Sequence, residues 1–266
     1  RLVLLRTSRP EAEAVAPFGK GTRRFHLEPL SRLDCYQLLD QWAGGDNMEE
    51  DFREKAIASA TGNPLHLKQL FAWWREDPGK AVSSLQKDKC PATFLDIIHQ
   101  RTSGLSREQL ECLQQAALIG EVFWHEVLPR SRYELARELA ERGFVHPLPV
   151  SVLPDTTAWR FAHARLPEVV LESIPGDCVV KWSLRVAENL EKLLDGKEEK
   201  ELFAAKIAGL YESACASGRA VPFWMMAGHR AKRLWELDSA KTLFQKALSC
   251  SDEPRTLDAC RARFEL

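Results

Sequence analysis

The sequence predicts a mainly α-helical protein with a few short strands. Over most of the chain, apolar residues recur every three or four positions, which is the period of an amphipathic helix. Strand-like runs are confined to the start of the chain and to one pair of segments between residues 144 and 161. From Arg165 to the last residue the helical period returns. We therefore expect helices before and after one small β-hairpin.

Composition and charge are those of an ordinary soluble protein. The 37 basic side chains nearly balance the 38 acidic ones in 266 residues, so no global field attracts nucleic acid or a membrane surface. Seven scattered cysteines without a CxxC pair favour reduced thiols and a cytoplasmic location. No apolar run reaches the roughly 20 residues that a membrane-spanning helix needs. The length favours two or three compact units.

Residues 1–30 carry the strand signals that precede the helices. Leu2–Leu5 is a short, continuous apolar run, typical of a strand buried on both faces of a parallel sheet. Arg23–Leu27 is expected to form a second strand, and Glu28–Ser31 the turn into a helix that its serine could cap. Because such a buried strand needs partner strands and the sequence begins inside the apolar run, we expect an excised piece of a longer protein.

Residues 31–90 have the pattern of a small helical unit. Three amphipathic helices are expected between residues 33 and 74, followed by a short fourth one. A TGNP turn at residues 61–64 separates the second helix from the third. In that turn Gly62 can adopt the positive φ that ends a helix, and Pro64 can take the first position of the next.

Residues 91–176 combine helices with the β-hairpin. The segment opens with short amphipathic helices, and Ser106 resembles an N-cap, because its hydroxyl can satisfy free amides of the first turn. A further helix is expected from about residue 132 to 141, followed by strand-like Phe144–Leu148 and Ala158–Phe161. Helices followed by a β-hairpin are typical of a winged-helix domain.

Residues 177–266 have the pattern of antiparallel helical hairpins. Helices are expected at about 177–194, 199–216, 219–235 and 237–250, with another beginning at about 254. Alanines paired with aromatic residues recur in them, as in helical repeats that stack against one another. We expect the beginning of a repeat array.

Nine short strings match one family in the right order. They are LRTSRP (Leu5–Pro10), LEPLS (Leu27–Ser31), TGNPLHL (Thr61–Leu67), LQQAALIG (Leu113–Gly120), RFAH (Arg160–His163), LESIP (Leu171–Pro175), AENLE (Ala187–Glu191), Ala227–Ala231 and Ala240–Leu248. In these strings the chain resembles the second half of the STAND-type AAA+ ATPase module, which occurs in bacterial proteins beside class III nucleotide cyclases, LuxR-type regulators and serine/threonine kinases. The resemblance covers nearly the whole chain and rests on the order and spacing of the strings.

The resemblance implies four segments. Residues 1–30 would be the last strands of an α/β P-loop ATPase core, 31–90 a helical lid, 91–176 a winged-helix domain with a small β-hairpin, and 177–266 the start of TPR-like repeats. It also implies that ATP or ADP binds with Mg²⁺ to Walker motifs upstream of this sequence. Gly19–Thr22 is no P-loop, since it lacks the spaced glycine and the leading strand. We therefore predict that these residues alone do not hydrolyse ATP.

The resemblance assigns a nucleotide contact to three residues. Arg9 matches the family's sensor arginine, whose charge can reach the γ-phosphate; a solvated arginine in a turn is the alternative. Pro64 matches the GxP element, whose ring packs on the adenine; a plain turn before a helix is the alternative. His163 matches a histidine that can donate to a β-phosphate, and the alternative is a histidine satisfied by the adjacent helix. No catalytic residue and no metal ligand are expected.

Three functions are compatible with these patterns. The first is a signalling switch in which ATP or ADP favours one arrangement of lid and winged helix, and the repeats bind a protein partner or effector. The second is a protein-interaction scaffold without nucleotide chemistry. The third is a DNA-binding winged helix, since four arginines lie between residues 130 and 142. Three interleaved glutamates cancel their field and argue against DNA binding. No membrane contact is expected.

Overall fold

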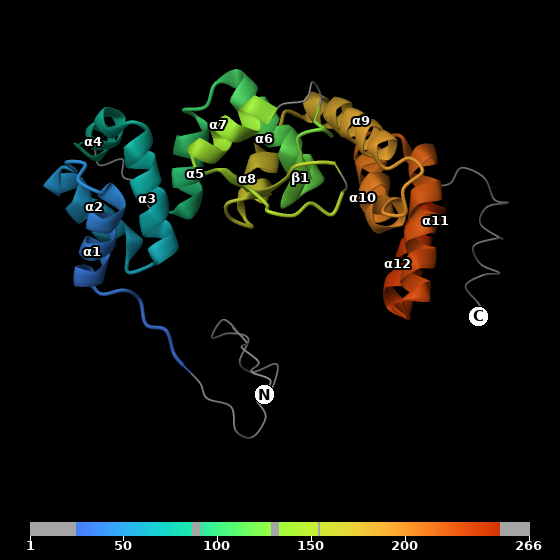
Figure 1. Cartoon of the computed structure of the whole chain (residues 1–266), viewed down its shortest axis with the longest axis horizontal. Helices are drawn as coiled ribbons and strands as arrows, with labels where there is room; N and C mark the ends of the chain where they lie inside the picture. Colours follow the sequence, from blue (N-terminus) through green and yellow to red (C-terminus); the bar gives the residue numbers. More distant parts are fainter. Residues whose placement is uncertain (1–24, 87–90, 92, 129–132, 154, 251–266) are drawn as a thin grey trace.

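The structure, a computed structural model, describes residues 25–86, 91, 93–128, 133–153 and 155–250. These residues form twelve helices and one three-stranded antiparallel sheet, so the prediction of a mainly α-helical chain with a small β component is confirmed. The elements form three groups in a row (Figure 1). We refer to α1–α4 as the first unit, to α5–α8 with the three strands as the middle unit, and to α9–α12 as the last unit.

The first unit is a small helical bundle around an aromatic core. The Phe52 ring contacts those of Trp73 and Trp74, with centroid distances of 6.2 and 6.3 Å. The Phe71 ring contacts that of Trp74, with a centroid distance of 5.9 Å. The predicted cap is present, because the Ser31 hydroxyl accepts a hydrogen bond from the Asp34 amide. The helices are α1 (Arg32–Ala43), α2 (Glu50–Ala60), α3 (Pro64–Glu76) and α4 (Pro78–Gln86). The three predicted helices and the short fourth one are confirmed.

The strand predicted at Arg23–Leu27 is not formed in its described part. Residues 25–31 have no strand pairing, and Phe25 and Leu27 are 83% and 90% exposed. The prediction was wrong there because alternating side chains form a strand only where a neighbouring strand satisfies the backbone hydrogen bonds. The strand predicted at Leu2–Leu5 lies outside the described residues.

The middle unit places the predicted hairpin beside a third strand. Strand β3 lies in the centre of the sheet, with Phe123 of β1 opposite Trp159 and His146 of β2 opposite Arg160. Ser106 caps α6 as predicted, in a capping box with Gln109. The elements are α5 (Phe94–Thr102), α6 (Arg107–Ile119), β1 (Val122–Trp124), α7 (Tyr133–Glu141), β2 (Val145–Pro147), β3 (Ala158–Phe161) and α8 (Leu166–Glu172).

The last unit consists of four helices close to the predicted ranges. A polar chain connects three of them: the Tyr211 hydroxyl of α10 donates to Glu191 of α9 (2.5 Å) and accepts from Arg219 of α11 (2.6 Å). These two bonds, together with burial, fix the ring of Tyr211 in the interior. The helices are α9 (Gly176–Leu193), α10 (Lys200–Ser213), α11 (Ser217–Arg233) and α12 (Leu237–Ser249). The helix expected from about residue 254 lies outside the described residues.

Two large cores meet along α5. The first unit has its own core, which includes Ile97 of α5, whereas Ile98 belongs to a second core that continues from the middle unit into α9, α10 and α11. Trp124 of β1 contacts Phe203 of α10 edge-on at 5.1 Å, within this second core. One core thus extends from the middle unit into the last unit, and the core of the first unit reaches as far as Ile97 of α5. No helix of the described residues is long and apolar enough to span a membrane.

Candidate nucleotide-facing turn and unit junction

The TGNP turn has the predicted conformation. Thr61 and Gly62 have φ values of 48° and 78°, both in the left-handed region. The Asn63 side chain then accepts hydrogen bonds from the Leu65 amide (3.0 Å) and the His66 amide (3.2 Å), and Pro64 occupies the first helical position. Proline has no amide to leave unsatisfied there. The turn therefore presents an exposed Pro64 ring at the start of α3.

The segment before α1 packs directly on this turn. The Leu30 amide donates to the Gly62 carbonyl (2.9 Å). A Cβ atom at position 62 would lie 2.7 Å from the Leu30 carbonyl oxygen and 2.7 Å from Pro29 Cβ, so only glycine fits. A hollow of about 240 Å³ opens beside the turn, between the start of α1 and the end of α2. The residues that line it are Leu30, Arg32, Cys35, Ile57, Ala58, Thr61 and Gly62.

Of the other two assigned residues, Arg9 lies outside the described residues and His163 lies after β3. The His163 ring packs on Phe94 of α5, with centroids 4.8 Å apart, and its Nδ1 accepts from the Arg165 amide (3.1 Å). Burial, and next the positive charge of Arg165, lower the pKa of His163. Pro64 and His163 therefore belong to different units, and the contacts of His163 are those of a histidine satisfied by its neighbours.

A second site, which the sequence analysis does not identify, joins the first unit to the middle unit. It is centred on Arg101, the last but one residue of α5, whose side chain is fully buried. Its Nε and Nη2 donate to Glu76 Oε1 at 3.0 and 2.7 Å, and its Nη1 donates to Gln69 Oε1 at 2.5 Å. Both acceptors lie on α3. We call Glu76, Arg101 and Arg142 the Glu76 clamp.

Arg142 completes the clamp from the middle unit. Its Nη2 donates to the other oxygen of Glu76 (3.2 Å) and its Nη1 to the Gly104 carbonyl (3.1 Å). The Arg142 carbonyl in turn accepts from Arg101 (2.5 Å), and the Arg101 guanidinium lies 4.3 Å from the centre of the Phe144 ring. Burial lowers the pKa of Arg101 and Glu76 opposes this shift, so the guanidinium remains charged. One carboxylate thus binds two arginines across the junction.

The sequence contains one signal for the clamp. Arg101 lies four positions after Ile97 and three after Ile98, so it continues the apolar stripe of α5. A charged residue in such a stripe is buried only with a partner. The partner Glu76 is 25 positions away and carries no matching signal.

Of the four arginines that suggested DNA binding, the two that the structure describes form ion pairs with glutamates. Arg137 of α7 pairs with Glu134 (3.0 Å) and approaches Glu141 (4.0 Å), and Arg142 belongs to the clamp. Arg130 and Arg132 lie outside the described residues. The prediction that the chain does not bind DNA stays a prediction.

Protonation of His66 should weaken the first unit. This histidine of α3 is buried, its Nε2 has no hydrogen-bond partner among the described residues, and burial lowers its pKa, opposed by Asp96. The folded pKa therefore lies below the unfolded value of about 6.5, and unfolding takes up a proton as the pH falls through this window. We expect the free energy of unfolding in urea to fall between pH 7 and pH 5. His66→Leu should flatten this slope, whereas the exposed His99→Leu should not. An unchanged slope in His66→Leu contradicts the prediction.

Comparison with known proteins gives no family assignment. No protein-family model matches the chain, and a search of curated proteins gives no significant match.

Proposed function

We propose that this chain provides the helical lid, the winged-helix domain and the first helical repeats of a STAND-type signalling switch that responds to ATP or ADP. In this proposal the first unit is the lid, the middle unit the winged helix and the last unit the start of the repeats. The Walker motifs and their Mg²⁺ would be contributed by residues upstream of the chain. The chain itself would not hydrolyse ATP.

The TGNP turn is the observation that carries the proposal. Its Pro64 ring is exposed at a helix start, and the adjacent hollow has apolar walls from Leu30 and Ile57. Such a surface fits one face of an adenine, since flat rings bind against apolar walls with few polar groups. The described residues offer no cluster of three or more His, Cys, Asp or Glu side chains for a metal ion. In the proposal the turn and its hollow contact the base of the nucleotide.

The junction supports a switch between two arrangements. The first unit has a core of its own that the middle unit enters only through Ile97 of α5, and the Glu76 clamp joins the two units across a buried interface. Separating them would expose the apolar surface around Ile97 and Ile98 and leave Arg101 without its carboxylate. A nucleotide shifts such an equilibrium only by binding one arrangement more tightly than the other. In the proposal, contacts at Pro64 on one side of the clamp and at His163 on the other provide that difference.

Nucleotide affinities test the proposal in a protein that includes the upstream segment. Pro64→Ala should weaken ATP and ADP equally, while Arg9→Ala should weaken ATP about tenfold and ADP less, because the lost charged hydrogen bond is to the γ-phosphate. His163→Ala should weaken ADP. Pro78→Ala, at the start of α4, is the matched control for Pro64. Fluorescent-nucleotide titration measures all four variants. Affinities as unchanged in the Pro64, Arg9 and His163 variants as in the control would remove these three residues from the mechanism.

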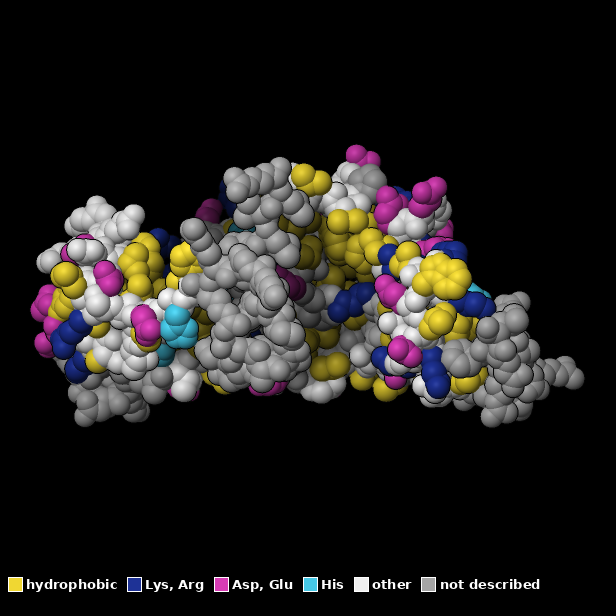
Figure 2. Space-filling model, turned by 90° about the horizontal axis from the view of Figure 1, so that it is seen from below, with side chains coloured by type: hydrophobic (Ala, Val, Ile, Leu, Met, Phe, Trp, Pro, Cys, Tyr) yellow, Lys and Arg dark blue, Asp and Glu magenta, His cyan; other side chains and the backbone are white. Residues whose placement is uncertain are grey.

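A protein-interaction scaffold is the second candidate, supported by the turn between α11 and α12. Leu234, Trp235 and Leu237 are 51%, 85% and 60% exposed there, and Trp235 has a φ of 62°. Figure 2 shows hydrophobic side chains bordered by Lys and Arg at this end of the molecule. Exposed aromatic and leucine side chains are typical anchors for a protein partner. If the longer protein binds neither ATP nor ADP, the nucleotide-dependent switch is ruled out and the scaffold remains as the candidate function.

A further inference from the structure

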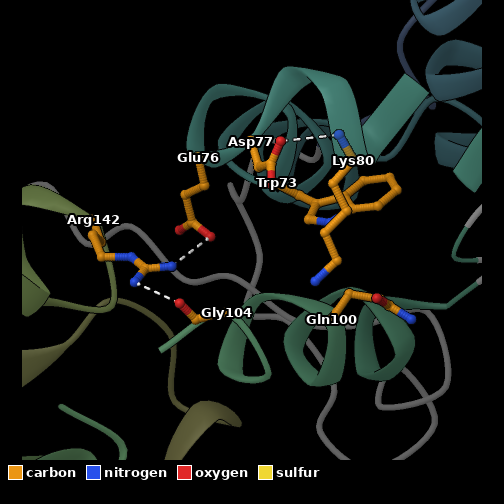
Figure 3. Close-up of a pocket in the computed structure, with 7 residues that line it drawn as sticks. All are labelled: Trp73, Glu76, Asp77, Lys80, Gln100, Gly104 and Arg142. Atoms are coloured by element: carbon orange, nitrogen blue, oxygen red, sulfur yellow. Dashed lines mark hydrogen bonds and ion pairs between the residues drawn. The ribbon is translucent and has the colours of Figure 1, made fainter. Parts of the chain in front are cut away.

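A second hollow, of about 340 Å³, lies beside the Glu76 clamp. It is bounded by the end of α3, the start of α4 and the end of α5, and Arg142 closes it from the middle unit (Figure 3). Its volume is in the range of small-molecule sites in proteins. The residues that line it are Trp73, Glu76, Asp77, Lys80, Gln100, Gly104 and Arg142. We call it the junction hollow.

Around the junction hollow, both carboxylates have hydrogen-bond partners and the Lys80 ammonium has none among the described residues. Glu76 already binds Arg101 and Arg142, and Asp77 accepts from the backbone amide of Lys80 (2.9 Å). The Lys80 ammonium has no hydrogen bond or ion pair among the described residues. In Figure 3 it points across the hollow toward the helix that carries Gln100. Two cations, Lys80 and Arg142, and two carboxylates line the hollow, and among the described residues Lys80 is the one charged side chain there without a partner.

We infer that the junction hollow binds a small oxyanion, of the phosphate or carboxylate type. Its oxygens would accept from Lys80 and from Arg142, which is a half-buried donor in the opposite wall. Because Arg142 Nη2 now donates to Glu76, the oxyanion competes with Glu76 for this arginine. Binding therefore loosens one of the two arginine contacts that join the first unit to the middle unit.

The inference that an oxyanion binds does not depend on the proposed function. The effect of that binding on signalling does rest on the proposed function. In a switch of two arrangements, a ligand that weakens the clamp in one arrangement favours the other. The junction hollow would then be a second input, separate from the TGNP turn and coupled to it through α3. Pro64 begins this helix and Glu76 ends it.

Isothermal titration of the full-length protein with inorganic phosphate and, in a second arm, with citrate tests the binding. Chloride keeps the ionic strength constant. Lys80→Gln should weaken the bound anion about fivefold, as expected for one exposed charge, whereas Lys68→Gln on the exposed face of α3 should change nothing. If just one of the two anions saturates the site, the inference holds and that anion shows whether the ligand is of the phosphate or the carboxylate type. Binding of neither anion, or equal affinity in native protein and Lys80→Gln, overturns the inference.

Hydrogen exchange tests the effect on the clamp in the same samples. With the anion at saturation, amides in the last turn of α5 and at Arg142 should exchange faster than without it, because the junction opens more often. The Lys80→Gln variant at the same anion concentration should show a smaller increase. Saturable binding with unchanged exchange would retain the site and refute the competition with Glu76. Failure of the nucleotide titrations described above would leave both results intact, so the two proposals are tested separately.

Discussion

Replacing Arg101 with methionine should reduce the free energy of unfolding by about 3–5 kcal/mol, the range measured when one partner of a buried ion pair is removed. Methionine fills most of the volume but donates no hydrogen bonds. Gln69 and the Arg142 carbonyl would then lose their donors in a buried environment, and Glu76 would keep only Arg142. Urea denaturation followed by circular dichroism measures the change.

Arg137→Met is the matched control for Arg101. This arginine forms ion pairs with two glutamates, but its side chain is 58% exposed on α7, where such pairs contribute between about 0 and 1 kcal/mol. Arg101→Lys separates charge from geometry, because an ammonium cannot reach Glu76, Gln69 and the Arg142 carbonyl together. We expect an intermediate loss for it. Equal stability of Arg101→Met and Arg137→Met would show that the clamp does not stabilise the junction.

A double-mutant cycle tests whether the loss of stability in Arg101→Met comes from its contact with Glu76. Glu76→Gln alone leaves two arginines without their carboxylate, and the double variant with Arg101→Met relieves part of this. We expect a coupling energy of about 1–3 kcal/mol between the two positions, as for residues in one buried network. Additive losses would mean that Glu76 and Arg101 act independently.

Gly62→Ala should have the second largest effect, a loss of about 2 kcal/mol. A left-handed backbone costs an alanine about 1–2 kcal/mol. In addition, the new methyl group would lie 2.7 Å from the Leu30 carbonyl oxygen, which is closer than contact distance, so residues 29 and 30 would have to move away from the turn. Thermal and urea unfolding measure the loss.

Gly44→Ala isolates the two contributions to the Gly62 effect. Gly44 ends α1 with a φ of 59°, similar to that of Gly62, but a Cβ atom there would meet nothing within 4 Å. The difference between the two variants is therefore the cost of displacing the segment before α1. If the proposed function holds, only Gly62→Ala should also weaken nucleotide binding in the longer protein, since Leu30 of the displaced segment lines the hollow beside the TGNP turn. Equal losses in both variants would mean that the Leu30 contact contributes nothing.

Local signals in the sequence predicted most helix ends. A Ser31 or Ser106 hydroxyl satisfies amides within the next three residues, and Gly62 and Pro64 act through their own backbone, so each effect is complete within one turn of helix. Strands do not carry such local signals, because each depends on a partner strand, and the sequence therefore misjudged two of them. β1 has only three residues, too few to show a period, and Phe25 and Leu27 alternate like a strand without a partner to pair with.

The sequence by itself determined most of the helices to within a few residues, the conformation of the TGNP turn and the hairpin of β2 and β3. Only the tertiary structure decided which cores merge and which charges meet. Arg101 binds residues 25, 32 and 41 positions away, and such contacts depend on how whole units pack rather than on neighbours in the chain. Burying this guanidinium is favourable only when each of its three nitrogens has an acceptor. That condition is met where three segments distant in sequence converge, which is why the clamp belongs to the fold and not to any one of its elements.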